Sequence, residues 1–360
     1  MTAPEPSSSA KSKQDSAPGQ NGLSGNGDIV PISLERRFLN IRTFVSFGVA
    51  FAILYFVFRQ IKLDVADIAR HIAAANPGLY LVALLVYYST FIVRSLRWRI
   101  LLQNVGLGQL PGQRLPSMLG MAEIIFLSWF ANCIMPAKLG DAYRAYLLKR
   151  NAQVSFSKTF GTILAERIID LLLTFVLLGI TGLVAFHGSF PSMVLVGMQA
   201  SLALALAVLV GLIAMRNFGT LIRRFLPRRL RHYYSLFEEG TLHSFRQLPL
   251  VLGYSTLAWI IEAGRLYFVV LALGLSGIGF PVVLFTAIAG SLLTSLPGTP
   301  AGLGVVESVI IGILLLAGSL GLVSGVNEGM ATSVAILDRT ISYWSLVLFG
   351  LVDYLLTKKK

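Results

Sequence analysis

The stretch PGTPAGLGVVESVIIGILLLAG, residues 297–318, decides how this chain folds. It ends a long apolar region, 281–318, and it opens with strong helix breakers at Pro297, Gly298, Pro300, Gly302 and Gly304. The apolar arm that follows, from Val305 to about Gly318, would be about 21 Å long as a helix. A bilayer core is about 30 Å thick, so this arm is too short to cross it. We therefore predict a re-entrant helical hairpin that enters and leaves the membrane by one face.

The composition is that of a membrane protein. Hydrophobic residues make up 55% of the chain, charged residues only 13%, and the mean hydropathy is +0.73. Backbone groups need internal hydrogen bonds in lipid, and the alternating pattern of a membrane β-barrel is absent, so the apolar runs are predicted to be helices. The predicted fold class is an all-α polytopic membrane protein with about six full spans and two re-entrant helical hairpins. The full spans are expected near residues 43–58, 78–93, 168–186, 193–214, 248–273 and 331–355.

Basic residues predict how the spans are oriented. The net charge is +13, and the positive residues gather in short loops beside apolar runs, which is typical of cytoplasmic loops rather than of a nucleic-acid-binding surface. The segments 187–192, 274–280 and 319–330 hold no Lys or Arg, whereas 215–247 is rich in arginine. We therefore expect a multi-pass protein of the cell (inner or plasma) membrane with cytoplasmic N- and C-termini, and no nucleic acid among its partners.

The expected organisation is one membrane domain with polar ends. Residues 1–35 are rich in Ser, Gly and Pro, which predicts a disordered cytoplasmic tail. Residues 36–355 would form a single transmembrane domain, in which 215–247 is an amphipathic cytoplasmic segment lying on the inner leaflet. Residues 356–360 would be a basic cytoplasmic tail. Cys133 is the only cysteine and the four histidines are scattered, so we expect neither a metal site nor a cofactor.

A second interrupted apolar region, 117–148, has the same plan as the first. Its break reads Pro136-Ala137-Lys138-Leu139-Gly140, and basic residues flank both of its ends, so this hairpin is expected to enter from the inner face. PAKLGDAYRAYLL at 136–148 shares Pro, Ala, Leu and Gly with PAGLGVVESVIIG at 300–312, and LAERIID at 164–170 resembles ILDRTIS at 336–342. The two halves, about 78–186 and about 248–355, each read span, hairpin, span, in opposite orientation. The sequence therefore predicts an inverted-topology repeat, as in many secondary transporters.

Ionisable side chains inside the apolar regions are the candidate functional residues, because each is costly in lipid unless it faces a partner or a polar cavity. They are Lys138, Asp141, Arg144, Glu166, Arg167, Asp170, Glu262, Arg265, Glu307, Asp338 and Arg339. Two interpretations stay open: ion pairs that hold the helices together, such as Glu262 with Arg265 three residues on, or one polar cavity shared by both halves. The distribution over both halves favours the cavity. The arginines of RSLRWR, which include Arg97, are expected at the inner interface as an anchor or as a phosphate contact.

Four motifs in order carry a resemblance to a known family. They are RSLRWRILL at 94–102, PAKLGDAYRAYLLKR at 136–150, ILAERIIDLL at 163–172 and PGTPAGLGVVESVI at 297–310. Over roughly residues 40–355 the chain resembles the flippase-like membrane proteins related to the transmembrane region of lysylphosphatidylglycerol synthase. The resemblance implies a lipid-handling domain, since the equivalent region of the synthase looks like the part that moves the modified lipid between leaflets. It suggests as cavity or headgroup residues Arg97, Asp141, Arg144, Glu166, Arg167 and Glu307. Thr-Pro-Ala-Gly-Leu-Gly stands here where a run of Pro and Gly is expected, so the hairpin tip differs in detail.

The function expected from these features is a lipid flippase or transporter. Its cargo would be an anionic or aminoacylated phospholipid, or a polyprenyl-phosphate-linked lipid, whose headgroup crosses through a polar intramembrane cavity. The longest hydrophilic segment within the membrane region, 215–247, is too short for a catalytic domain, so a separate enzyme would make the lipid. Two alternatives remain: an intramembrane lipid-modifying transferase, although no nucleophile-base pair supports it, or a scaffold that transports nothing. Glycine-rich spans fit close packing within one chain or in a homodimer.

Overall fold

The computed structural model describes residues 48, 64–109, 111–135, 139–186, 192–294 and 300–357. The predicted tail 1–35, almost all of the predicted span 43–58 and the last three residues of the basic tail lie outside the described residues. Six positions of the predicted hairpin breaks also lie outside them, namely Pro136, Ala137, Lys138, Pro297, Gly298 and Thr299. The side chains of residues 192–194, 293, 294 and 300 are likewise outside the description.

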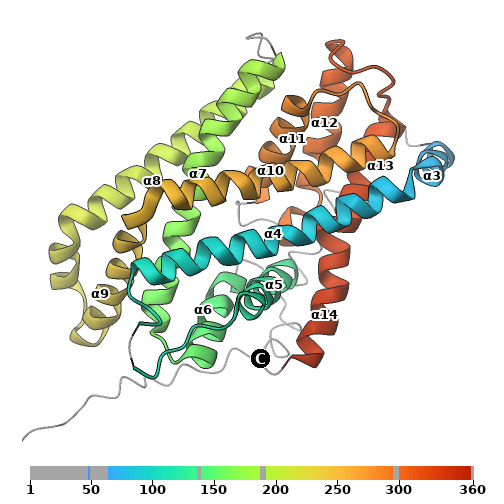
Figure 1. Cartoon of the computed structure of the whole chain (residues 1–360). Helices are drawn as coiled ribbons and strands as arrows, with labels where there is room; N and C mark the ends of the chain where they lie inside the picture. Colours follow the sequence, from blue (N-terminus) through green and yellow to red (C-terminus); the bar gives the residue numbers. More distant parts are fainter. Residues whose placement is uncertain are drawn as a thin grey trace, which may run out of the picture. The chain divides into compact units, whose positions relative to one another are not determined.

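Every regular element in the described ranges is a helix (Figure 1). The helices are α3 (Val65–Ala74), α4 (Pro77–Asn104), α5 (Met118–Ile134), α6 (Leu139–Ala152), α7 (Phe156–Phe186), α8 (Ser192–Phe225), α9 (Arg228–His243), α10 (Leu248–Ala272), α11 (Phe280–Thr294), α12 (Val305–Ser319), α13 (Glu328–Arg339) and α14 (Leu346–Leu356). Short 3₁₀ turns lie at Ser244–Gln247 and Pro300–Gly302, and a π-helical turn at Thr340–Ser345 joins α13 to α14. The prediction of an all-α chain is confirmed for the described residues.

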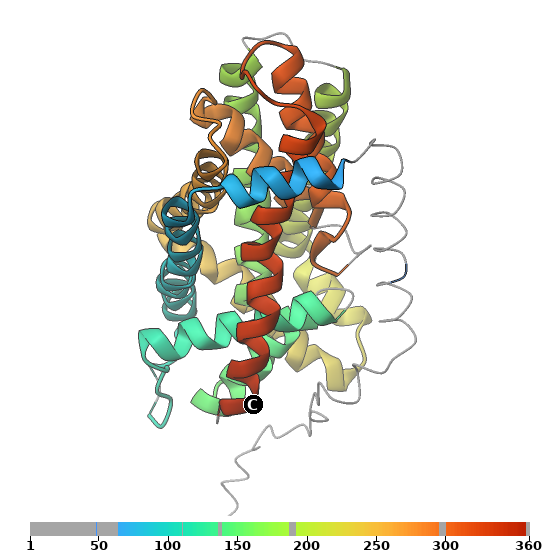
Figure 2. The ribbon, with the colours of Figure 1, turned by 90° about the vertical axis from the view of Figure 1, so that its right-hand side faces the viewer.

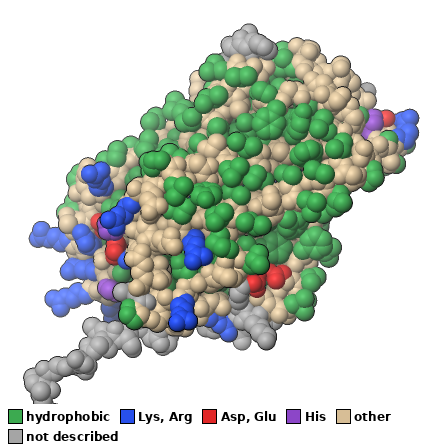
Figure 3. Space-filling model, viewed as in Figure 1, with side chains coloured by type: hydrophobic (Ala, Val, Ile, Leu, Met, Phe, Trp, Pro, Cys, Tyr) green, Lys and Arg blue, Asp and Glu red, His purple; other side chains and the backbone are tan. Residues whose placement is uncertain are grey.

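Five helical stretches are long and apolar enough to cross a membrane. They are Pro77–Asn104, Phe156–Phe186, Leu195–Phe225, Arg228–Ala272 and Glu328–Leu356, and they contain five of the six predicted spans. Figure 3 shows apolar side chains across the middle of one face and lysines and arginines gathered at its lower left. The chain is a multi-pass membrane protein, as its composition predicts.

Three helix boundaries differ from the prediction. The helix expected to end at residue 93 continues as α4 to Asn104, so RSLRWR lies inside a helix. The helix expected to begin at residue 168 begins at Phe156, which places Glu166 in its interior. The segment 215–247 is divided between two helices: its first part, up to Phe225, is the end of α8, and α9 begins after a turn at Pro227.

The short helices come in two pairs, each with a sharp break that the sequence predicts. In the first pair, the Gly140 N–H donates to the Asn132 side chain at 2.8 Å, and the Ser128 hydroxyl donates to the Gly140 carbonyl at 2.9 Å. Gly140 is the second residue of α6, whereas the sequence placed it before the helix. In the second pair, α12 begins after Gly304, whose φ of 83° suits glycine and whose N–H donates to Glu307 at 2.8 Å.

The two halves of the chain pack internally in the same way. In the first half α4 contacts α5, α5 contacts α6, and α6 contacts α7; in the second half α10, α11, α12 and α13 make the corresponding contacts. The halves meet along α4 and α10, which run side by side in Figure 1. The first short helix of each half also packs on the last helix of the other, α5 on α14 and α11 on α7, while Figure 2 shows α3 lying across α13. Each half therefore makes the same series of helix contacts within itself, and its first short helix packs on the last helix of the other half.

Candidate functional site

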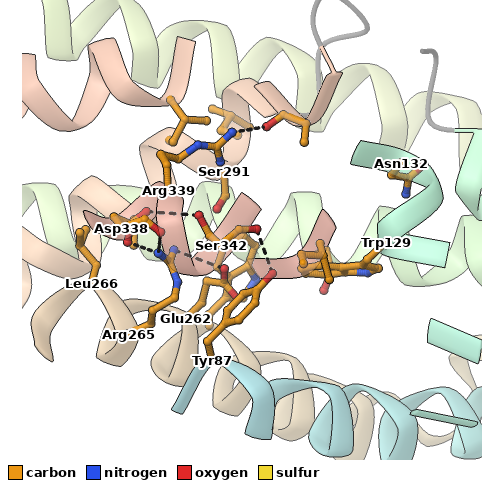
Figure 4. Close-up of a pocket in the computed structure, with 18 of the residues that line it drawn as sticks. Tyr87, Trp129, Asn132, Glu262, Arg265, Leu266, Ser291, Asp338, Arg339 and Ser342 are labelled. Carbon is orange, nitrogen blue, oxygen red and sulfur yellow. Dashed lines mark hydrogen bonds and ion pairs between the residues drawn. The ribbon is translucent and has the colours of Figure 1, made fainter. Parts of the chain in front are cut away.

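A cavity of about 430 Å³ lies among helices of both halves. Its size falls within the range of about 300–1,000 Å³ that is typical of small-molecule sites. Its charged lining residues are four arginines, Arg94, Arg167, Arg265 and Arg339, and four acids, Asp141, Asp170, Glu262 and Asp338. Figure 4 shows Tyr87, Trp129, Asn132, Ser291 and Ser342 among the other lining residues. A cavity with this many charges, among helices that are otherwise apolar outside, can hold a polar or charged group.

The charged residues pair in a pattern that repeats in each half. In the first half Arg97 of α4 pairs with Glu166 of α7 at 2.8 Å, and in the second half Arg265 of α10 pairs with Asp338 of α13. The residue after each of these two acids is an arginine, and that arginine reaches back to an acid in the first turn of the second short helix. These pairs are Arg167 with Asp141 at 2.7 Å and Arg339 with Glu307 at 2.9 Å.

Additional contacts of Arg97 and the contacts of Arg144 connect the helices of the first half. Arg97 also pairs with Asp170, to which both of its terminal nitrogens donate, and its side chain is only 1% exposed. Arg144 donates to Glu166 at 3.1 Å and stacks over the Trp98 ring at 3.8 Å. Buried charges of this kind are tolerated only when they are paired with good geometry.

The structure thus separates the predicted candidates into two groups. Asp141, Arg167, Asp170, Glu262, Arg265, Asp338 and Arg339 line the cavity, whereas Arg97, Arg144, Glu166 and Glu307 are buried behind it in ion pairs. Lys138 lies outside the described residues. Ion pairing is therefore found in both groups, and only the first group also faces the cavity.

Several lining residues were not among the sequence candidates. Arg94 was expected at the membrane interface, but its side chain is 7% exposed and lies over the Trp129 ring at 4.7 Å. Its position three residues before Arg97 puts it on the same helix face, which is a signal that the sequence contains. Tyr87, whose hydroxyl donates to the Ser342 carbonyl at 3.1 Å, gives no such signal because tyrosine is common in membrane helices.

The cavity rim is more exposed on the side of α6 and α7. The side chain of Arg167 is 32% exposed and that of its partner Asp141 is 13% exposed. In the matching pair of the second half, Arg339 is 8% and Glu307 is 10% exposed. Among the described residues, no group of three or more His, Cys, Asp or Glu side chains is placed to hold a metal ion.

Comparisons with known proteins give one family and several relatives. The family described as lysylphosphatidylglycerol synthase TM region matches residues 43–350. A UPF0104 membrane protein of Methanocaldococcus jannaschii is 35% identical over 232 residues, which are 64% of this chain and 95% of that protein. A UPF0104 membrane protein of Pyrococcus horikoshii is 24% identical over 313 residues, covering 79% and 89% of the two chains. Glycosyltransferase AglD of Haloferax volcanii is 24% identical over 336 residues, covering 82% of this chain and 51% of that protein.

Proposed function

Because this chain belongs to the lysylphosphatidylglycerol synthase TM region family, we propose that it moves a lipid between the two leaflets of a membrane. The observation that carries the proposal is the cavity of about 430 Å³ with eight charged side chains, placed among helices that are long enough to cross a bilayer. Ionisable groups among membrane-spanning helices are costly and usually mark the path of a polar substrate. The lipid headgroup would enter this cavity while its acyl chains stay in the surrounding lipid.

The proposed architecture is an inverted repeat with two re-entrant hairpins, α5–α6 and α11–α12. Its support is the equivalent packing of the two halves and the ion pairs that repeat between them. Transporters of this architecture bind substrate near the middle of the membrane, between the repeats. The proposed orientation in the cell membrane, with both termini cytoplasmic, rests on the positive residues of α9 and the C-terminus.

Alternating access would depend on two matching ion pairs, each of which holds the second short helix of one half. Asp141 with Arg167 ties α6 to α7, and Glu307 with Arg339 ties α12 to α13. The first pair is the more exposed, which supports a state that is more open on the side of α6. Movement of a headgroup would open the two rims in turn. A separate enzyme would supply the lipid.

One comparison favours a second candidate function. A relative is named a glycosyltransferase, and this chain corresponds to 51% of its length. A chain of this family could therefore hold a lipid for group transfer rather than move it. In that case the lipid would be changed covalently when the purified protein is given a donor.

Reconstitution into liposomes distinguishes the two functions. Fluorescent phospholipid is placed in both leaflets and dithionite is added outside, so that only outer-leaflet probe is reduced unless lipid crosses. The assay is run with and without an imposed ion gradient. We expect the quenched fraction to exceed the outer-leaflet share for the protein and for the control Gly179→Ala, whose added Cβ meets nothing within 4 Å. It should fall to the protein-free level for Arg265→Leu/Asp338→Leu, which removes a lining pair without orphaning a charge. Folded protein that moves no lipid in either condition would contradict transport, and a change in lipid mass would favour group transfer.

A further inference from the structure

The ion pair between Arg94 of α4 and Glu262 of α10 is the loosest in the cavity wall. The nearest nitrogen and oxygen are 3.7 Å apart, which is beyond a hydrogen bond, and the two side chains are 7% and 9% exposed. Arg94 Nε and Glu262 Oε2 are both buried without a hydrogen-bond partner among the described residues. Glu262 also faces Arg265 at 3.5 Å, again without a hydrogen bond. Some atoms of Arg97, Arg144, Glu166 and Arg265 are also unpartnered, but each of those residues makes a hydrogen bond through another atom. Among the described residues no side-chain hydrogen bond is found for Arg94 or Glu262, and buried polar groups are nearly always hydrogen-bonded, so this pair indicates a missing partner.

Each of the other charged residues of the cluster has a hydrogen-bonded partner of opposite charge. Six arginines and six acids lie in or behind the cavity, all of them buried except Arg167, and five hydrogen-bonded pairs use five of each. These pairs are Arg97 with Asp170, Arg144 with Glu166, Arg167 with Asp141, Arg265 with Asp338 and Arg339 with Glu307. Arg94 and Glu262 are the two residues left over. A ligand that binds both residues must therefore supply a negative group to Arg94 and a positive group to Glu262.

We propose that the cavity selects a zwitterionic phospholipid headgroup, with its phosphodiester on Arg94 and its ammonium on Glu262. The proposal rests on the lipid-transport function proposed above. Insertion of such a headgroup would replace one loose pair by two hydrogen-bonded pairs and leave the cluster electrically neutral. A headgroup with a net charge would leave one unbalanced charge in a region of low dielectric, which is unfavourable.

The surroundings of Arg94 suit a phosphate. The Trp129 ring lies 4.7 Å from the guanidinium of Arg94, which lines the cavity, so the aromatic face helps to fix the plane of the guanidinium. An arginine edge donates two parallel hydrogen bonds to phosphate oxygens. Glu262 belongs to the facing helix, so the phosphate and the ammonium would each contact a different half of the chain.

Transfer rates of lipids that differ only in headgroup test the inference. Dithionite assays would compare phosphatidylethanolamine with phosphatidylglycerol of the same acyl chains, in liposomes that contain the full chain. A hydrogen bond to a charged group is worth about 1.5–3 kcal/mol, so we expect the zwitterionic lipid to move about tenfold faster or more. Glu262→Gln should lower this preference about tenfold, because the wall then carries an extra positive charge that suits the anionic lipid. Arg94→Gln should slow both lipids.

The outcomes separate this inference from the function on which it rests. If no lipid moves, the proposed function fails. If both lipids move equally and Glu262→Gln does not change their ratio, the headgroup inference is overturned while transport stands. If Glu262→Gln does not fold, the inference is tested on the wild-type protein in detergent by its melting temperature. The zwitterionic lipid should raise this temperature more than the anionic lipid does. An equal rise would overturn the inference.

Discussion

Replacement of Arg97 by methionine should destabilise the protein strongly, and a second substitution should reverse part of the loss. The Arg97 side chain is 1% exposed and pairs with Asp170 and with Glu166 at 2.8 Å. Glu166 keeps Arg144 at 3.1 Å, but Asp170 loses the arginine that donates both of its hydrogen bonds. Removal of one partner from a buried pair costs about 3–5 kcal/mol, mostly because the other charge is left uncompensated. We expect Arg97→Met to lower the free energy of unfolding by that amount.

The double variant Arg97→Met/Asp170→Leu removes the orphaned carboxylate as well. Apolar replacement of a whole buried pair is often neutral or stabilising. Two losses remain, since Arg97 also donates to the Ser255 hydroxyl at 2.8 Å and Glu166 loses one of its two arginines. A hydrogen bond to a charged group is worth about 1.5–3 kcal/mol, so the double variant should lie about that far below the wild type before the gain from apolar packing is counted.

The chain supplies its own probe of unfolding. Cys133 is the only cysteine and is 2% exposed, so a thiol-reactive dye should label it only as the protein opens. Unfolding in detergent mixed with increasing SDS would be followed by this labelling. Arg224→Met, at an exposed arginine of α8, is the matched control and should change the free energy of unfolding by less than about 0.5 kcal/mol. If the double variant is as unstable as Arg97→Met, the loss comes from packing and the argument from an orphaned charge is refuted.

Three other substitutions test the packing and the rim. Gly140→Ala should destabilise the α5–α6 pair, because its Cβ would lie 2.1 Å from the Ser128 carbonyl oxygen. Labelling of Cys133 by the dye should show the loss of stability, and equal stability of Gly140→Ala and Gly179→Ala would argue against the close approach. Gly240→Ala should loosen α9 from α7, since its Cβ would lie 2.2 Å from the Lys158 carbonyl oxygen; faster trypsin cleavage in α9 would report this, and an unchanged rate would oppose it. Glu307→Gln should slow lipid transfer at least about tenfold by releasing Arg339 from its buried partner, whereas transfer at the wild-type rate would remove the α12 rim from the mechanism.

The helices were predictable because they depend on local chemistry. Apolar runs of sufficient length must be helical in lipid, and the Pro and Gly residues at 297–304 mark a break whatever the rest of the chain does. The end of α4 was not predictable in this way. Three arginines in RSLRWR indicate a helix end when read alone, yet in the structure Arg94 and Arg97 continue into the protein interior because acids of α7 and α10 neutralise them.

The site was predictable as a set of residues but not as a set of partners. The close pair Glu262 with Arg265 is present, at 3.5 Å, as the spacing of three residues predicts. The hydrogen-bonded partner of Arg265 is nevertheless Asp338, which is 73 residues away. Sequence spacing identifies neighbours on one helix only, so it could not separate the four candidates behind the cavity from the seven that line it.

The π-helical turn at Thr340–Ser345 is a phase slip in an otherwise continuous helix. Because a π turn accommodates one extra residue, α14 is rotated by about one residue step, roughly 100°, from its place in an unbroken α-helix. With the slip, Gly350 meets Phe130 so closely that an added Cβ would lie 2.6 Å from its ring. Without it, a large neighbour such as Phe349 or Leu351, now exposed on the outer side, would be turned toward that contact. Deletion of one residue within 340–345 would therefore rotate α14 by roughly 100° although every other residue of the helix is unchanged. The rotation would bring a side chain that is now exposed, such as Phe349 or Leu351, to the contact with Phe130.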